Sequence, residues 1–303
     1  MITGGAGFVG SNLAEVLVEK GHEVVVLDNF FLGSEKNLEK VKKDVTIVKG
    51  DVRNKELVMK VSKKMDFIFH EAAASSSPMF RDNLAETMEI NINGTINVLE
   101  AARQNSVKRV VYASTSSLYG SNPAPLKEDM ALRPVNFYAS SKLMKEHLAG
   151  LFGVEFGVET VGLRFGSVYG PHEESKGIYA NLVSQFLWAI KKGEKPVVYG
   201  NGRQKRDFIY VKDICQAHIL AAAAKKKMLG EIFNVATGKT TTFNEMISTL
   251  SAVTGIKTKT KFVRNPVKNY IYDQGLDITK ITSVLGYKPE YTLKEGVEKL
   301  ADS

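Results

Sequence analysis

The residue pair best suited to chemistry in this sequence is Tyr138 and Lys142, which stand four positions apart. On a helix, that spacing places both side chains on one face, one turn apart. A free tyrosine has a pKa of about 10 and is a poor base at neutral pH, but a neighbouring ammonium group favours its phenolate form. Tyr138 is therefore a candidate proton acceptor for a substrate hydroxyl group.

A glycine-rich turn lies at the start of the sequence, where Gly4, Gly7 and Gly10 follow the pattern G-x-x-G-x-x-G. Glycines there allow a tight turn and a close backbone approach to a pyrophosphate, and the helix expected from Ser11 directs its positive N-terminal end to that group. Asp28 ends the next expected strand, 18 residues beyond Gly10. A carboxylate at this place holds a ribose hydroxyl and repels a 2′-phosphate, so the pattern predicts NAD rather than NADP.

Short apolar runs alternate with helical patterns through the first half of the sequence. The apolar runs predict strands at 23–28, 45–50, 67–71, 109–115 and 159–165, and the stretches between them predict helices at 11–20, 55–64, 84–104 and 136–152. Repeated βαβ units with nearly continuous apolar strands predict an α/β fold, a doubly wound parallel sheet of the Rossmann type. Only three residues precede the glycines, so either the central strand is very short or the sequence as given begins late.

The second half has a looser pattern that predicts a smaller α/β lobe. Helices are expected at 176–192, 213–226, 243–254 and 293–301, and strands at 196–199, 208–211 and 232–235. We expect residues 1–165 to form the NAD-binding domain, and residues 166–303 to form mainly a substrate-binding lobe that is partly interleaved with the first.

The bulk composition narrows the class of protein further. The 303 residues are 44% hydrophobic and carry a net charge of +8, spread over scattered basic residues. This favours a lysine-rich solvated surface over nucleic-acid binding, since no nucleic-acid motif occurs. A single cysteine, Cys215, allows no internal disulfide and no cysteine-built metal site. No signal-peptide pattern or bilayer-length apolar run occurs, so the expected location is cytoplasmic and no membrane partner is expected.

Ten motifs, in the order of the chain, carry a resemblance to one family. They are TGGAGFVGSNL, LDNFFLG, KGDVRN, NINGTINVLEAA, STSSLYG, YASSK, LRFGSVYGP, RDFIYVKD, FNVATG and LGYKP. Over essentially its whole length, the sequence resembles the NAD-dependent epimerase/dehydratase branch of the extended short-chain dehydrogenases/reductases. The resemblance implies redox chemistry on a nucleotide-activated sugar with NAD as the cofactor.

The resemblance also implies roles for individual residues. Tyr138 would be the base, Lys142 would hold the nicotinamide ribose, and Thr115 would hydrogen-bond the reacting sugar oxygen. The residues implied at the cofactor are Gly4, Gly7, Phe8, Val9, Asp28, Asn29, Asp51, Val52, Ala72, Ala73, Ala74, Asn93, Ser114, Tyr138 and Lys142. The residues implied at the substrate are Ser75, Thr115, Ser116, Ser167, Arg206 and Lys268.

Three of the substrate positions bear on which sugar is bound. Arg206 resembles the arginine that pairs with the substrate pyrophosphate. Ser167 stands where the family usually has asparagine, and Lys268 lies near the place of a family arginine that binds phosphate. Residues 272–275 fall roughly where the size of the sugar is gated. These departures leave open whether an N-acetyl group is accepted.

The residues after Thr115 discriminate between reactions of the family. Dehydratases of this branch carry an Asp-Glu pair directly after the Ser/Thr, and UDP-glucuronate decarboxylases carry a glutamate there, whereas this chain has Ser116 and Ser117. The expected reaction is therefore 4-epimerisation of a UDP-hexose, such as UDP-glucose, UDP-galactose or their N-acetyl forms, through a transient 4-keto sugar with retained NAD. The alternatives are a 4,6-dehydratase, a decarboxylase, a 5-epimerase, an NAD-dependent dehydrogenase or a non-catalytic dinucleotide sensor.

Two further expectations concern assembly and the histidines. The helices at 84–104 and 136–152 resemble those that pair two family subunits through a four-helix bundle, so a homodimer is expected. His22, His147 and His218 are expected on helix or turn surfaces, and His70 is expected to serve packing.

Overall fold

A seven-stranded parallel sheet forms the centre of the protein, in the order β11-β6-β5-β4-β1-β2-β3. The computed structural model describes residues 1–266 and 270–303. The strands of the sheet are β1 (Ile2–Thr3), β2 (Val24–Asp28), β3 (Val45–Lys49), β4 (Phe67–His70), β5 (Arg109–Thr115), β6 (Thr160–Phe165) and β11 (Leu229–Val235). This confirms the doubly wound α/β fold. The central strand β1 is two residues long.

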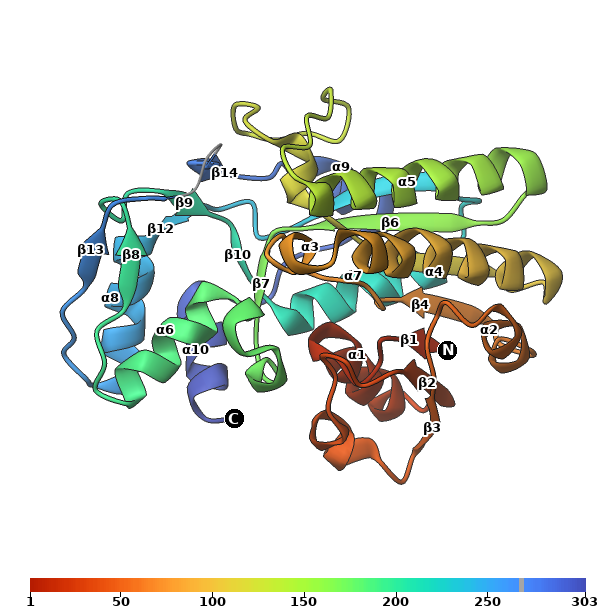
Figure 1. Cartoon of the computed structure of the whole chain (residues 1–303), viewed down its shortest axis with the longest axis horizontal. Coiled ribbons are helices and arrows are strands. Elements are labelled where there is room, and N and C mark those ends of the chain that lie inside the picture. The colour runs from red at the N-terminus through yellow and green to blue at the C-terminus, as the bar shows by residue number, and fades with distance from the viewer. Residues whose placement is uncertain (267–269) are drawn as a thin grey trace.

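Helices cover both faces of the sheet (Figure 1). On one face, α1 (Phe8–Glu19) packs against α7 (Val211–Ala223). On the other face, α4 (Leu84–Gln104) packs between α2 (Lys55–Val61) and α5 (Phe137–Phe156). Short helical segments η1 (Glu35–Val41), α3 (Met79–Asp82) and η2 (Ser116–Tyr119) connect these layers.

Alternating strand side chains build two cores, because successive residues of a strand point to opposite faces. Val26, Phe69 and Val111 join the cluster that α1 and α7 cover. Their neighbours Leu27, Ile68 and Val110 join the cluster under α2 and α4.

The smaller lobe surrounds a third core of buried residues from α6, α8 and α10. Its helical elements are η3 (Glu174–Tyr179), α6 (Leu182–Lys191), α8 (Phe243–Thr254) and α10 (Leu293–Ala301). Helix α9 (Thr279–Leu285) instead packs against β11 of the large sheet. The strands of the smaller lobe are β7 (Ser167–Tyr169), β8 (Val197–Tyr199), β9 (Lys205–Arg206), β10 (Phe208–Tyr210), β12 (Thr241–Thr242), β13 (Lys261–Val263) and β14 (Asp273–Gln274). Between these elements the chain returns to the large sheet through α7 and β11.

The elements lie close to where the patterns predict them, with one clear difference. The helix expected over 176–192 is divided: Gly177, with a φ of 51°, kinks η3, and Ala180 is extended before α6 begins at Leu182. Asn181 caps α6 by accepting a hydrogen bond from the amide of Val183. No helix in the described part of the chain is long and apolar enough to span a membrane.

Arg109, at the start of β5, joins the sheet to the end of α7. Its guanidinium donates to the carbonyl oxygens of Ala221 at 2.6 Å and Ala222 at 3.2 Å. It also forms an ion pair with Glu159 at 2.5 Å. Carbonyl groups in the last turn of a helix have no intrahelical partner, so Arg109 satisfies groups that burial would otherwise leave unpaired.

We predict that Arg109→Met lowers the free energy of unfolding by about 3 kcal/mol, since one partner of a buried pair is removed. Urea denaturation measures this loss. The matched control is Lys108→Met, because Lys108 pairs with Asp66 on the surface and exposed pairs contribute only about 0–1 kcal/mol. Equal losses in the two variants would contradict the role of Arg109.

Candidate active site

A cavity of about 260 Å³ lies along the carboxyl ends of the central strands, where ligands bind in open α/β sheets. It is lined by residues that follow β1, β2, β3, β4, β5 and β6. The predicted site residues among them are Gly4, Gly7, Phe8, Val9, Asp28, Asn29, Asp51, Val52, Ala72, Ala73, Ala74, Ser75, Ser114, Thr115, Tyr138 and Lys142. The parallel sheet thus brings together segments from residue 4 to residue 142.

The glycine turn between β1 and α1 fits a pyrophosphate. Gly4 has a φ of 67°, and a Cβ there would lie 2.6 Å from the backbone nitrogen of Ala72. No side chain of the described residues caps the start of α1. The first amides of a helix have no intrahelical acceptor, and Phe8 and Val9 of that turn line the cavity. These donors and the helix dipole suit the NAD pyrophosphate.

Asp28, at the end of β2, is hydrogen-bonded to the backbone of the glycine turn. Its carboxylate accepts hydrogen bonds from the amides of Ala6 at 2.9 Å and Phe30 at 2.7 Å. Burial raises the pKa of Asp28, and the hydrogen bonds from these amides oppose the shift. Each carboxylate oxygen keeps a lone pair beyond those the amides use, so the carboxylate can still accept ribose hydroxyls.

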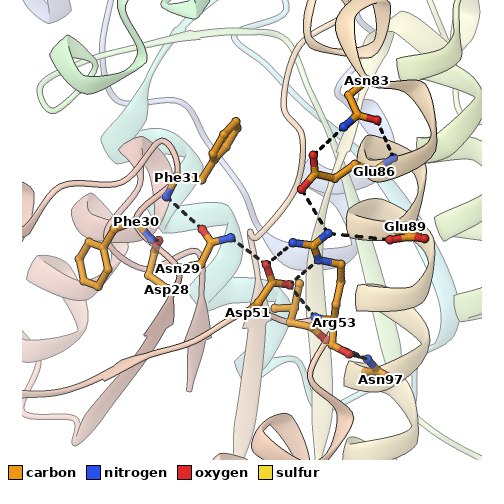
Figure 2. A network of polar contacts seen from close by, with 11 residues as sticks. Asp28, Asn29, Phe30, Phe31, Asp51, Arg53, Asn83, Glu86, Glu89 and Asn97 are labelled. Carbon is orange, nitrogen blue, oxygen red and sulfur yellow. Dashed lines mark hydrogen bonds and ion pairs between the residues drawn. The ribbon is translucent and has the colours of Figure 1, made fainter.

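A polar network beside Asp28 braces the adenosine end of the cavity (Figure 2). The side-chain amide of Asn29 donates to Asp51 at 2.9 Å. Arg53 donates to Asp51 at 2.8 Å and reaches Glu86 of α4 at 3.3 Å. The hydrogen bond from Arg53 is the main reason that the pKa of Asp51 falls to about 2. The network ties the end of β3 to α4.

Tyr138, Lys142 and Thr115 meet at the other end of the cavity. Asn136 caps α5 by accepting from the amide of Ala139, which starts the helix that carries both Tyr138 and Lys142. The Lys142 ammonium donates to the Ala113 carbonyl at 3.2 Å and lies 5.8 Å from the centre of the Tyr138 ring. Burial lowers the pKa of Lys142 to about 8, against the opposing effect of nearby carboxylates.

The hydroxyl groups of Tyr138 and Thr115 lie at the same end of the cavity. Burial raises the pKa of Tyr138, and the Thr115 hydroxyl partly opposes the shift. A phenol, a hydroxyl and an ammonium group therefore converge where a substrate hydroxyl could be deprotonated.

Asn91, rather than Asn93, supports this end of the cavity. Asn93 is exposed on α4 and does not line the cavity, so the prediction for it is corrected. Asn91 is buried, and its side chain exchanges hydrogen bonds with the backbone of Ala74 and donates to Ser141 of α5 at 2.8 Å. At about 3.6 residues per turn, a step of two residues rotates the side chain by about 200°, so Asn91 and Asn93 lie on opposite faces of α4.

The remaining predicted substrate residues lie outside the cavity lining. Ser116 is buried and accepts a hydrogen bond from Gln274 at 2.9 Å. Ser167 starts β7 between two lining residues. Arg206 in β9 donates to the carbonyl oxygen of Ile271 at 2.8 Å. Lys268 lies outside the described residues.

Sequence reasoning missed Glu71, which lines the cavity directly after β4. Its carboxylate lies 2.9 Å from His218 Nε2. His218 is fully buried, so its expected surface position is wrong. His70, the neighbour of Glu71, is buried between Thr3 and Thr95, to which it is hydrogen-bonded. The sequence feature that could have identified Glu71 as a cavity residue is its position at the carboxyl end of a strand.

Comparison with known proteins identifies the family of this chain. Residues 1–236 match the model of the NAD dependent epimerase/dehydratase family. The chain belongs to that family. It is therefore an enzyme whose cofactor is NAD, and the glycine turn and Asp28 are the residues that fit it.

Relatives within the family differ in the reaction that their names state. A putative UDP-glucose 4-epimerase of Methanocaldococcus jannaschii is 33% identical over 100% of this chain and 97% of its own. A UDP-N-acetyl-alpha-D-glucosaminuronate decarboxylase of Bacillus cytotoxicus is 31% identical over 99% and 95%. The crystal structure of a UDP-glucose 4-epimerase with UDP-glucose from Thermotoga maritima has a TM-score of 0.93, with 30% identity, over 99% and 96% of the two chains.

We predict that Gly10→Ala weakens NAD binding at least about tenfold, or ~1.4 kcal/mol. A Cβ at Gly10 would overlap the carbonyl oxygen of Gly4 and push α1 away from the turn. Calorimetric titration with NAD measures the loss. Gly150→Ala is the control, since a Cβ there has no atom within 4 Å. Unchanged NAD affinity in Gly10→Ala would contradict the pyrophosphate assignment.

Proposed function

We propose that this enzyme interconverts the 4-epimers of a UDP-hexose, with NAD retained through the cycle. The observation that carries the proposal is the set of groups at the catalytic end of the cavity. Tyr138, Lys142 and Thr115 supply a phenol, an ammonium and a hydroxyl group. The two positions after Thr115 hold serines, so the carboxylates that an elimination or a decarboxylation uses in related enzymes are missing there.

The mechanism assigns one task to each side chain. Bound NAD supplies a hydride acceptor that later returns the hydride. Tyr138 takes the proton from the sugar 4-hydroxyl and gives it back to the oxygen after the 4-keto sugar has turned. Lys142 favours the phenolate form by its charge, and Thr115 hydrogen-bonds the same sugar oxygen and keeps the phenol oriented.

The substrate nucleotide is assigned to the lobe side of the site. Arg206 is the candidate for the pyrophosphate, because a guanidinium can bind phosphate in a bidentate manner. The Arg206 guanidinium donates to backbone carbonyl oxygens. Its Cζ atom lies 5.7 Å from the ring centre of Phe243 and 5.5 Å from that of Tyr270. Lys268 is proposed as a second phosphate ligand, and Ser116, Ser167 and Ser75 as sugar contacts.

A sister reaction on a nucleotide sugar is the second candidate function. The decarboxylase relative of Bacillus cytotoxicus favours it, since its identity to this chain is 31%. The products separate the two. A 4-epimerase forms an equilibrium pair of hexoses, whereas a dehydratase leaves a stable 4-keto sugar, a decarboxylase releases carbon dioxide, and a dehydrogenase accumulates free reduced cofactor.

We predict that the wild-type enzyme converts at least one pair among UDP-glucose, UDP-galactose and their N-acetyl forms, and that Tyr138→Phe lowers kcat by about 10²–10⁴-fold. The loss follows from removal of the proton acceptor alone. Chromatography of the UDP-sugars measures turnover. Calorimetry with NAD and UDP provides the control, because both should bind the variant as they bind the wild type.

Two outcomes would contradict this function. Failure to convert any UDP-hexose with NAD present would remove the 4-epimerase proposal. Unchanged turnover in Tyr138→Phe would remove Tyr138 from the mechanism while leaving the reaction itself in place.

We also propose a homodimer through the outer surface of α4 and α5. These helices lie side by side on the outside of the sheet (Figure 1). Phe137, Met144 and Leu151 are spaced seven residues apart on α5 and are 56%, 46% and 45% exposed. A seven-residue spacing keeps large apolar side chains on one helix face, which suits a symmetric helix–helix contact with a second copy.

We predict that the double substitution Met144→Lys and Leu151→Lys yields a monomer, since like charges would face each other across the two-fold axis. Sedimentation equilibrium measures the mass. Val197→Lys is the control, because Val197 is equally exposed, at 48%, on β8 of the smaller lobe. A wild-type monomer, or a dimer that survives the double substitution, would refute this interface.

A further inference from the structure

Glu71 is the carboxylate at the catalytic end of the cavity. Three acidic side chains line the cavity within the described part of the chain, namely Asp28, Asp51 and Glu71. Asp28 and Asp51 lie at the adenosine end, where amides and Arg53 hold them. Glu71 follows β4, beside the strand that ends at Thr115. The proton transfer assigned to Tyr138, Lys142 and Thr115 does not use this carboxylate.

His218 of α7 holds Glu71 in a defined position. The Glu71 side chain is 5% exposed and the His218 side chain is 0% exposed. Nδ1 of His218 lies 2.8 Å from the carbonyl oxygen of Ile214. A carbonyl oxygen only accepts, so Nδ1 carries a proton. Nε2 faces the Glu71 carboxylate at 2.9 Å, and one further proton must occupy that contact.

Glu71 follows the strand next to the one that Lys142 contacts. His70, the last residue of β4, pairs with Tyr112 in the parallel ladder of β4 and β5, and Ala113 is the residue after Tyr112. Lys142 donates its hydrogen bond to the carbonyl oxygen of Ala113. Both Glu71 and Lys142 line the same cavity.

Few other groups can balance the Lys142 charge. Glu146 on the same helix is engaged by Arg164 at 2.7 Å and by Ser114 at 2.5 Å. Lys145, one turn beyond Lys142, is fully buried and its Nζ has no hydrogen-bond partner among the described residues. The titratable groups around the Lys142 ammonium group are His70 and Glu71 at the end of β4, Tyr112 of β5, Tyr138, Lys145 and Glu146 of α5, and His218 of α7.

The charges around Glu71 favour its ionised form. Burial by itself would raise the pKa of Glu71, but the charge and hydrogen bond of His218, together with Lys142 and Lys145, bring it below its ordinary value. Glu71 therefore carries its negative charge at the cavity wall.

We propose that Glu71, oriented by His218, is a positioning residue that keeps the ammonium group of Lys142 charged. This inference rests on the proposed function in one respect: in that function, the charge of Lys142 favours the phenolate form of Tyr138.

Direct titration of Lys142 tests the proposal without sugar or turnover. The protein is labelled with carbon-13 at lysine Cε, and the Lys142 resonance is identified by its loss in Lys142→Arg. Burial sets the wild-type pKa of Lys142 at about 8. In Glu71→Gln, which keeps the shape and the contact with His218, we expect the midpoint to fall by about one pH unit, a tenfold weaker hold on the proton. Glu71→Asn carries the same expectation should the first variant not fold.

Glu159→Gln is the matched control, since Glu159 also forms a partly buried ion pair but lies at the amino end of the same sheet, beside Arg109. In Glu159→Gln, the midpoint of the Lys142 titration should equal that of the wild type.

Steady-state assays provide a second readout. The alkaline limb of the plot of kcat against pH should move to lower pH in Glu71→Gln and stay in place in Glu159→Gln. A Lys142 midpoint unmoved by Glu71→Gln, or moved equally by Glu159→Gln, would overturn the proposal. Absence of sugar turnover, with the midpoint shifted, would instead count against the proposed function alone.

Discussion

The close contact between the turn after β1 and the end of β4 determines the geometry of the whole cleft. Thr3 accepts a backbone hydrogen bond from Glu71 at 3.1 Å, and its side chain bonds His70 at 2.7 Å. Gly4 then passes so near Ala72 that a side chain would collide with it. Because of this contact, the start of α1, the pyrophosphate turn and the floor beneath the catalytic groups form one rigid arrangement.

Buried polar pairs extend that arrangement to the faces of the sheet. Arg164 and Glu146 join β6 to α5, and Asn91 joins α4 to both Ala74 and α5. His218 reaches Glu71 from α7 on the opposite face. Such pairs are costly to bury unless each group is satisfied, so their presence around the cavity points to positional control of Lys142 and Tyr138 rather than to stability alone.

The placement of acidic groups bears on the chemistry that the site can perform. Serines follow Thr115 in this chain, and Ser116 is engaged by Gln274. The catalytic end instead has a carboxylate on the neighbouring strand, held by a histidine. A carboxylate oriented to an ammonium group tunes charge and is poorly placed to donate protons to a leaving group, which agrees with a reaction that needs only one proton acceptor.

Local patterning was sufficient for the strands, the glycine turn, the Tyr138–Lys142 pair and the strand-end residues, because parallel sheets gather the carboxyl ends of their strands at one edge. The register of α4 is what patterning could not decide: Asn91 is buried against Ala74 and α5, and Asn93 is exposed to solvent. The partnership of Glu71 with His218 joins residues 147 positions apart, and no local period reports such a contact. The contact depends on α7 packing against β5 and β6 of the sheet, and only the packed fold establishes that arrangement.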